Sequence, residues 1–204
     1  MENLNQLISE TVFLELKMLR CTKNCTSELA SAYNEDVFQT IRGNQLKGWS
    51  YPMLESYRRD IDHALAECRN LYCERYAYLL MQLDPEKYQN LQDRLPKPVI
   101  EKRWLVDWIC QARSSWWEAL GCMRAEAQTL MWSLYQNADN MAPEVCLRSE
   151  LMTYSVETLR LYAAYVEKLQ KENRDIDQVI LEQLLNDYGY SSLKDAVQKR
   201  AAGL

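Results

Sequence analysis

Apolar residues recur every three or four positions through most of this 204-residue chain. Such spacing is typical of amphipathic helices, which turn one face toward a core. It predicts helices over residues 3–20, 27–46, 50–69, 70–83, 84–92, 99–136, 143–152, 155–172 and 175–188, with a last short helix after Ser191 or Ser192. No segment alternates apolar and polar residues for long enough to indicate a strand. The pattern therefore predicts an all-α fold, a compact bundle of several helices.

Capping residues and one pair of prolines divide the chain into these helices. Ser50, Asp84, Ser155 and Asp175 are of the types that accept hydrogen bonds from the first free amides of a helix, so each predicts a helix start. Two prolines two residues apart do not fit inside a helix, so Leu95–Pro98 is predicted to be a linker. We expect one helical domain over residues 1–204, built from two halves at about 1–95 and 99–204.

The two halves share a weak sequence pattern, which we interpret as a degenerate internal duplication. Segments 41–70 and 143–175 can be aligned with an offset of 105 residues. This alignment pairs five identical residues: Ser50 with Ser155, Leu54 with Leu159, Tyr57 with Tyr162, Glu67 with Glu172 and Arg69 with Arg174. Trp49 then faces Tyr154, and one inserted residue brings Arg42 onto Arg148. The repeat predicts architecture, and it names no reaction.

Composition and charge exclude several classes of protein. The chain has 48% hydrophobic and 26% charged residues, which is ordinary for a globular protein. A formal charge of -5 argues against a nucleic-acid partner, because binding to phosphates needs clustered Lys and Arg. No apolar run is long enough to span a membrane, and the polar N-terminus is unlike a signal peptide. Seven scattered cysteines, an odd number, favour free thiols in a reducing cytoplasm.

The usual motifs of catalysis and metal binding are missing from the sequence. Five isolated glycines do not form a phosphate-binding loop, and the single histidine, His63, lacks the partners of a catalytic triad. We expect His63 to lie on a solvated helix surface. Cys21 and Cys25 have the spacing of a metal or redox pair, but no second cysteine pair completes a zinc site. We therefore predict free thiols there, with no metal and no cofactor.

A stripe of tryptophans runs along the long helix that follows the linker. Trp104, Trp108 and Trp116 lie at helical spacing on one face. Such a stripe can wall an aromatic pocket, but it more often packs into a core. We expect it to belong to the core.

The paired arginines and aromatic residues of the repeat are the candidate binding site. An arginine within an apolar helix is costly to bury unless it is paired or holds an anion. If both copies face one cleft between the halves, Arg42 and Arg148 would hold an anion. Polar contacts would come from Gln45, Tyr57, Glu150 and Tyr162, while Trp49 and Tyr154 would wall the cleft.

Carboxylates near the same positions supply candidate catalytic groups. If the protein is an enzyme, Glu150 or Glu118 is the expected general base, with a pKa raised by burial. Two alternatives remain open: Arg42 forms a structural ion pair with Glu35 or Asp36, or Glu15 joins Glu118 and Glu150 in a metal site.

Three segments resemble a known family: FQTIRGNQLKGW from Phe38, LESYRRDIDHALAECRNLYCERYAYLL from Leu54, and LRSELMTYSVETLRLYAAYV from Leu147, with DPEKY and RLP between them. They resemble an uncharacterised bacterial family catalogued only as a domain of unknown function, whose members are helical, of similar length and common in anaerobes. The resemblance covers nearly the whole chain and implies an all-α fold in the cytoplasm. The chain departs from the family at Cys21–Cys25 and around Cys122–Asn140. No catalytic role is implied.

Two functions from different classes are consistent with these observations. The first is a cytoplasmic protein that binds or processes a small polar or anionic metabolite in a cleft between its halves. The second is an accessory or chaperone-like protein that holds a peptide or protein partner in a helical groove, for which eight methionines and six tryptophans supply adaptable apolar surface. The sequence leaves open whether the protein is an enzyme.

Overall fold

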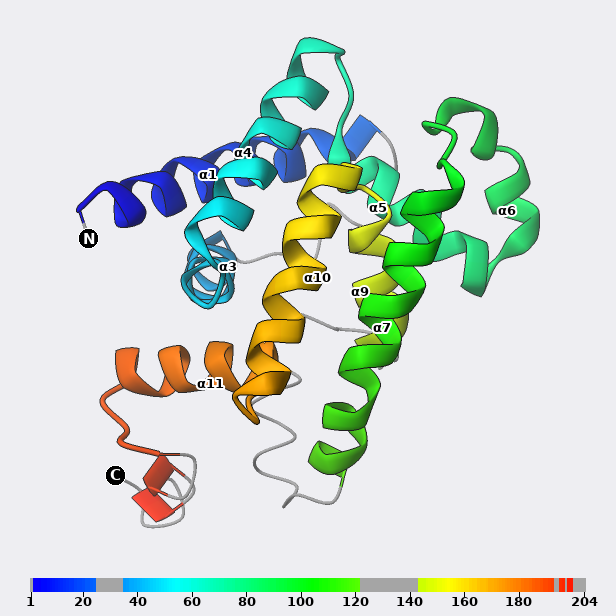
Figure 1. The fold of residues 1–204 in the computed structure, drawn as a ribbon. Helices are drawn as coiled ribbons and strands as arrows, with labels where there is room; N and C mark the ends of the chain where they lie inside the picture. Colours follow the sequence, from blue (N-terminus) through cyan, green and yellow to red (C-terminus); the bar gives the residue numbers. More distant parts are fainter. Residues whose placement is uncertain (1, 25–34, 122–142, 193–194, 197, 200–204) are drawn as a thin grey trace.

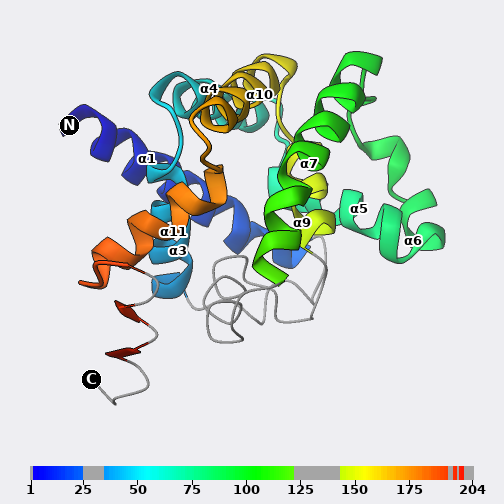
Figure 2. The ribbon, with the colours of Figure 1, turned by 60° about the horizontal axis from the view of Figure 1, so that its bottom comes forward.

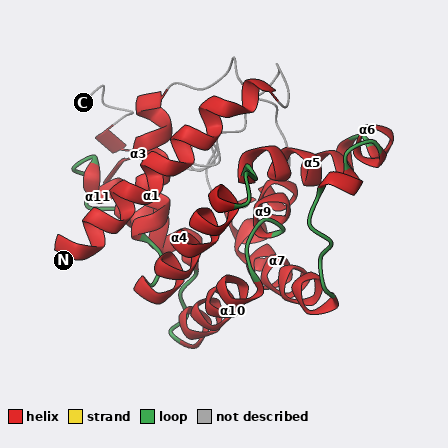
Figure 3. Cartoon of the chain, turned by 90° about the horizontal axis from the view of Figure 1, so that it is seen from above, coloured by secondary structure: helices red, strands yellow, loops and turns green. Residues whose placement is uncertain are grey.

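All regular elements of the described chain are helices, which confirms the predicted fold class (Figures 1 and 3). A computed structural model describes residues 2–24, 35–121, 143–192, 195–196 and 198–199. The α-helices, with the short 3-10 turns Cys21–Asn24 and Gln92–Arg94 between them, are α1 (Glu2–Arg20), α3 (Glu35–Lys47), α4 (Tyr51–Ala66), α5 (Leu71–Leu83), α6 (Pro85–Gln89), α7 (Ile100–Gly121), α9 (Pro143–Leu151), α10 (Val156–Lys171) and α11 (Ile176–Asp187).

Several helices begin where the sequence predicts a capping residue. The Asp84 carboxylate accepts from the amide of Lys87, the Ser155 hydroxyl from Thr158, and the Asp175 carboxylate from Asp177. These bonds satisfy amides that have no partner within their own helix. Ser50 also stands directly before α4, but its side chain makes no capping hydrogen bond.

Helices that are far apart in sequence pack together across the molecule. In the first part of the chain α1 packs on α3 and α4, and in the second part α7 packs on α9 and α10. Helices α4 and α10 are in contact with each other (Figure 1). The remaining contacts cross over, because α5 packs on α9 and α11 packs on α3 (Figure 2). The short helix α6 lies at the periphery, next to α5.

A close approach holds α11 against the end of α3. A Cβ atom added at Gly48 would lie 2.6 Å from Cγ1 of Ile180, much closer than two carbon atoms can pack. A larger residue at this position would therefore require the Ile180 side chain or α11 to shift. The next residue, Trp49, lies in the core with 7% of its surface exposed.

The tryptophan stripe of α7 is only partly in the core. Trp108 packs against the core from a half-buried position, as expected. Trp104 is 63% exposed, so the prediction that it lies in the core is wrong. Ile100, one turn earlier in α7, is 87% exposed. The Trp116 side chain lies outside the described residues.

The sequence also predicted a surface position for the single histidine and free thiols for the cysteines. His63 has 74% of its side chain exposed beside Glu67, which confirms a surface position. Cys21, Cys68, Cys110 and Cys146 are free thiols, as predicted. Cys73 is disulfide-bonded, so the prediction of free thiols is wrong for this residue. Cys25 lies outside the described residues.

A membrane-spanning segment was not expected, and the described helices agree. None of them combines the length and the apolar character needed to cross a bilayer.

Candidate functional site

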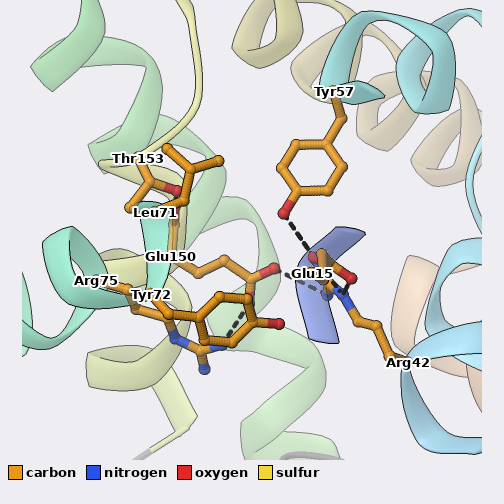
Figure 4. A pocket seen from close by; sticks show the side chains of 8 residues that line it. All are labelled: Glu15, Arg42, Tyr57, Leu71, Tyr72, Arg75, Glu150 and Thr153. Carbon is orange, nitrogen blue, oxygen red and sulfur yellow. Dashed lines mark hydrogen bonds and ion pairs between the residues drawn. The ribbon is translucent and has the colours of Figure 1, made fainter. Parts of the chain in front are cut away.

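A small pocket opens where α5 and α9 meet the buried ends of side chains from α1, α3 and α4 (Figure 4). About 210 Å³ of space lies among the lining side chains when the open solvent at its mouth is included. Most of its lining is polar or charged: Glu15, Arg42, Tyr57, Leu71, Tyr72, Arg75, Glu150 and Thr153. These residues come from both sides of the Leu95–Pro98 segment, so the pocket lies where the first and second parts of the chain meet.

The inner wall of the pocket is a buried ion pair between Glu15 of α1 and Arg42 of α3. Nε of Arg42 lies 3.0 and 2.9 Å from the two carboxylate oxygens, and Nη2 donates to Oε1 at 2.8 Å. Only 1% of the Glu15 side chain and 8% of the Arg42 side chain are exposed. The Tyr57 hydroxyl of α4 donates to the same Oε1 at 2.6 Å. Three helices therefore converge on one carboxylate.

Arg42 also reaches across to Glu150 of α9. Its Nη1 lies 2.9 Å from Oε1 of Glu150 and donates to Oε1 of Gln45 at 2.9 Å. The Tyr154 hydroxyl donates to Glu150 Oε1 as well. The guanidinium thus bridges two carboxylates from distant parts of the chain. This arrangement replaces the ion pair with Glu35 or Asp36 that the sequence left open, since Glu35 accepts from Arg20 instead.

The mouth of the pocket carries a looser pair of charges. Nη1 of Arg75 lies 3.5 Å from Oε2 of Glu150, which is longer than the usual 2.7–2.9 Å of a charge-assisted hydrogen bond. Both side chains keep contact with solvent, 32% for Arg75 and 18% for Glu150. The Tyr72 ring points its hydroxyl into the pocket (Figure 4), where it makes no hydrogen bond to another described side chain.

The start of α5 fixes the direction of these mouth residues. The Asn70 side chain accepts from the amides of Tyr72 and Cys73, and it donates to the backbone carbonyl of Met18 at 2.7 Å. One side chain therefore caps α5 and ties it to the end of α1. On the opposite side, the Thr153 hydroxyl donates to the backbone carbonyl of Glu150 at 2.7 Å and holds the end of α9.

The surroundings of Glu150 and Arg42 keep these two groups ionised, and burial keeps the phenols neutral. Burial raises the pKa of Glu150, but Arg42, Arg75 and the Tyr154 hydroxyl lower it by more than burial raises it. The resulting pKa is about 2. Burial lowers the pKa of Arg42, and the nearby carboxylates of Glu15 and Glu150 raise it well above its ordinary value. Burial also raises the pKa of Tyr57 and Tyr72.

The low pKa of Glu150 bears on the catalytic role expected from sequence. We expected burial to raise the pKa of this carboxyl and make it a general base. A carboxylate with a pKa near 2 is a weak base at neutral pH. The geometry instead suits Glu150 to hold a positive group.

An aromatic cluster packs behind the pocket, and one of its members, Tyr57, also lines the pocket. Trp49 meets the rings of Tyr57, Tyr154 and Tyr162 edge-on, with centroids 5.4, 6.0 and 5.8 Å away. The central carbon of the Arg42 guanidinium lies 5.6 Å from the Trp49 ring and 5.7 Å from the Tyr57 ring. This geometry is that of a cation–π contact. The cluster fixes the arginine, and Trp49 and Tyr154 stand one layer from the pocket.

Two predicted residues lie away from the pocket. Arg148 pairs with Asp107 of α7 and with Glu144 at 3.7 Å, so it does not share a cleft with Arg42. Tyr162 accepts a hydrogen bond from Nη1 of Arg113 at 2.6 Å. Arg113 is in turn paired with the fully buried Asp177, in a second polar cluster between α7, α10 and α11.

The carboxylate metal site considered from sequence joins Glu15 and Glu150 to Glu118, so the described residues do not test it. The described residues contain no group of three or more His, Cys, Asp and Glu side chains placed to hold a metal ion. The Glu118 side chain, which was also a candidate general base, lies outside the described residues.

Sequence reasoning missed the four pocket residues Leu71, Tyr72, Arg75 and Thr153. No motif marks them. Arg75 and Tyr72 reach the pocket only because α5 packs on α9, whose first residue comes 60 positions after the end of α5. Helical periodicity places Leu71 on an apolar face, but it does not say which helix covers that face.

Comparison with known proteins gives a family and no activity. Neither the curated proteins nor the solved structures compared with the chain gave a match. One family model does match, over residues 5–198, and its description is "Protein of unknown function (DUF4125)". The match covers nearly the whole chain, including every pocket residue. The chain therefore belongs to the DUF4125 family of proteins of unknown function.

Proposed function

We propose that this protein binds a small polar metabolite with an acidic group in the pocket between α5 and α9. The single observation that carries the proposal is the convergence of four charged side chains from four helices on one partly open pocket: Glu15, Arg42, Arg75 and Glu150. Placing ionised groups away from water costs free energy, which a structural role alone would avoid with apolar side chains. Convergent polar groups in a concave site are typical of ligand sites.

The inner and outer charges play different parts in this proposal. Arg42 already uses Nε, Nη1 and Nη2 in hydrogen bonds, so it orders the pocket and has little left for a ligand. The Arg75 side chain is 32% exposed, against 8% for Arg42, so it can be reached from solvent. An incoming acidic group would therefore bind Arg75 at the mouth, against the side chains of Tyr72 and Leu71.

A thermal-shift panel tests this proposal. Small organic acids and inorganic phosphate are added one by one to the wild type, to Arg75→Ala and to Arg160→Ala. Arg160 is a matched control because it pairs with Glu101 on the surface, where 63% of its side chain is exposed. At a concentration about 100 times its dissociation constant, a ligand stabilises the folded protein by about 2.7 kcal/mol.

We expect at least one acid to raise the melting temperature of the wild type and of Arg160→Ala, with no rise in Arg75→Ala. A panel in which no acid shifts the wild type, or in which Arg75→Ala responds as the wild type does, would overturn the proposal. Saturation-transfer NMR on the same samples separates binding from nonspecific salt effects.

A second candidate is the accessory role in which the protein holds a peptide. The observation that favours it is the exposed apolar start of α7, where Val99, Ile100 and Trp104 are 57%, 87% and 63% exposed. Large exposed apolar groups that lie together often mark protein contacts. In an aggregation assay with a denatured test protein, the wild type would suppress aggregation and the double variant Ile100→Ser/Trp104→Ser would not. Equal results for both would remove this candidate.

We also propose that the two halves of the chain descend from one duplicated unit. Helices α4 and α10 both contain 16 residues and begin at Tyr51 and Val156, an offset of 105. At the same offset, Cys68 and Asn173 both adopt left-handed backbone angles, with φ of 57° and 52°. These correspondences support the duplication inferred from sequence. The polar partners differ, since Tyr57 donates to Glu15 and Tyr162 accepts from Arg113.

A further inference from the structure

The start of α7 exposes three large apolar side chains to water. Val99, Ile100 and Trp104 are 57%, 87% and 63% exposed. Ile100 and Trp104 are four residues apart in α7, so they lie on the same face of the helix, one turn from each other. A partner that covers this face would remove apolar surface from water, which is favourable.

The arginines next to this face differ from those elsewhere on the molecule. Every other arginine that the structure describes has a carboxylate oxygen at 3.5 Å or less. In the described part of the chain Arg94 and Arg103 are the exceptions, and both are exposed. Arg103 adjoins Trp104 and follows Ile100 by three residues, a spacing at which helix side chains are neighbours. An unpaired guanidinium therefore stands beside the apolar face.

The local charge is opposite in sign to the charge of the whole chain. Residues 93–104 contain four cationic and two anionic side chains, a net charge of +2, against -5 for the chain. One of the anions, Glu101, already accepts a hydrogen bond from Nε of Arg160 at 2.7 Å. One of the cations, Lys102, donates to the backbone carbonyl of Met152. The exposed cations that remain are Arg94, Lys97 and Arg103.

We infer that this surface docks a protein segment that carries both acidic and apolar side chains. We call it the α7 surface and define it by Lys97, Val99, Ile100, Arg103 and Trp104. Apolar side chains of the partner cover Ile100 and Trp104, while its carboxylates pair with Lys97 and Arg103. Tryptophan and arginine are enriched where protein interfaces gain most of their free energy, and opposite charges steer the partner into register. The inference rests on the accessory role given above as the second candidate, and it specifies the partner.

An anionic membrane is the other surface that attracts basic and apolar side chains together. Segments that bind one commonly gather about four to eight Lys and Arg residues, and they lay an apolar helix face along the bilayer. The α7 surface has fewer exposed cations, and the chain as a whole is negative, so an anionic bilayer would repel it. Helix α7 also packs Leu105, Val106 and Ile109 into the core, so this part of it is not available to a bilayer. These observations favour a protein partner.

Three synthetic peptides with one helical pattern test the inference. The leucine–glutamate peptide has leucine at its apolar positions and glutamate at its polar positions. The leucine–lysine peptide replaces the glutamates by lysine, and the serine–glutamate peptide replaces the leucines by serine. Fluorescence anisotropy of the labelled peptides gives their dissociation constants. We expect the leucine–glutamate peptide to bind the wild type about tenfold or more tightly than either of the others, as the loss of one charged contact implies.

Two double variants should change these affinities in different ways. Lys97→Glu/Arg103→Glu makes the surface acidic and keeps its apolar side chains, so the leucine–lysine peptide should become the tighter of the two leucine peptides. Ile100→Ser/Trp104→Ser removes the apolar face, so both leucine peptides should lose about tenfold or more in affinity. All four side chains are exposed, and circular dichroism checks that the variants fold.

Helix α1 supplies a matched control. Phe13 is 53% exposed, and Nζ of Lys17 lies 4.6 Å from the centre of its ring. The double variant Phe13→Ser/Lys17→Glu therefore removes an exposed aromatic ring and reverses a neighbouring cation on another surface. It should bind all three peptides as the wild type does. A loss as large as that of the α7 variants would mean that the peptides do not bind at α7, and the inference would be wrong.

The outcomes separate this inference from the role on which it rests. If both leucine peptides bind the wild type equally and lose affinity in Ile100→Ser/Trp104→Ser, the accessory role stands and the acidic partner is wrong. The same conclusion follows if no peptide binds while the aggregation assay still depends on Ile100 and Trp104. If no peptide binds and that assay shows no such dependence, both proposals fall.

Vesicles of equal parts phosphatidylserine and phosphatidylcholine test the membrane alternative. We expect no cosedimentation of the wild type with them. Cosedimentation that is lost in Lys97→Glu/Arg103→Glu, without a preference for the leucine–glutamate peptide, would show that the surface binds a membrane and would overturn the inference.

Discussion

Arg42 is the residue on which the polar interior depends. It joins Glu15 and Glu150, which lie 135 residues apart in sequence, and its guanidinium faces the Trp49 and Tyr57 rings. Because the Glu15 side chain is only 1% exposed, removing the arginine strands its carboxylate away from water. A substitution of Arg42 should therefore affect the stability of the fold more directly than it affects ligand binding.

We predict that Arg42→Met lowers the free energy of unfolding by about 3–5 kcal/mol, the usual cost of breaking a buried ion pair from one side. Urea denaturation followed by circular dichroism measures it. The double variant Glu15→Gln/Arg42→Met should recover part of the loss, because the stranded charge is removed. Arg160→Met is the control and should change stability by less than about 0.5 kcal/mol. A loss equal to that of the control would show that the pair does not stabilise the fold.

Glu150 should make the stability of the fold depend on pH in the acidic range. Its pKa in the folded protein, about 2, lies below its ordinary value of 4.5. A carboxylate with a lowered pKa stabilises the fold above its unfolded pKa, and the stabilisation is lost as the pH falls from 4.5 toward 2. We predict that the stability difference between wild type and Glu150→Gln, on the order of 3 kcal/mol near neutral pH, shrinks over this interval.

The measurement is urea denaturation of both proteins from about pH 6 to about pH 2.5, a range that spans the titration of this carboxylate. Subtracting the variant removes the effect of all other titrating groups. A difference that stays constant with pH would mean that Glu150 is not held ionised by Arg42 and Arg75.

Part of the site could be predicted at the residue scale. Arg42, Tyr57 and Glu150 were candidates because a polar residue within an apolar helix needs a partner. Arg148 was expected beside Arg42 from the repeat, but on α9 it faces α7 and pairs with Asp107. Arg75 gave no signal, since an arginine near the start of a helix reads as an ordinary surface residue. The local sequence pattern identifies a polar side chain that is costly to bury, but it does not identify the residue that pairs with it.

At the scale of elements, the contact between α3 and α11 depends on a glycine. Gly48 lies directly after α3, where its Cα hydrogens face Ile180. Gly43, inside α3, has no atom within 4 Å of an added Cβ. The two positions form a matched pair, because the same substitution meets a neighbouring helix at one and open space at the other.

We predict that Gly48→Ala destabilises the protein by about 1–3 kcal/mol, the usual cost of overpacking. Gly43→Ala should stabilise it by up to about 1 kcal/mol, because alanine favours a helix over glycine. Melting temperatures from differential scanning calorimetry compare both with the wild type. Equal shifts in the two variants would contradict the close packing of α11 on α3.

Helix positions were predicted better than helix partners. The starts of α6, α10 and α11 follow from Asp84, Ser155 and Asp175, because capping is decided within a few residues. The crossed contacts of α5 with α9 and of α11 with α3 were not predictable. Periodicity tells which face of a helix is apolar, and many helices can cover that face. Trp104 misled for the same reason: periodicity placed it on an apolar face, but 63% of its surface is exposed.

At the scale of the whole molecule, the crossed contacts create the pocket. Helix α9 belongs to the second part of the chain, yet it lies against α5 and brings Glu150 to Arg42 and Arg75 of the first part. Contacts between α4 and α10 hold the two parts together: Ser56 and Thr158 share a hydrogen bond of 2.8 Å, and Asp60 accepts from the Ser155 amide at 2.9 Å. The pocket therefore exists only when both parts are folded together.

A crystal structure at saturating concentration of the probe that stabilises the protein most tests the central claim most directly. We predict electron density for the probe at the Arg75 guanidinium, against the side chains of Tyr72 and Leu71. A pocket that holds only water, with Arg75 still paired to Glu150 and the probe bound elsewhere, would contradict the account.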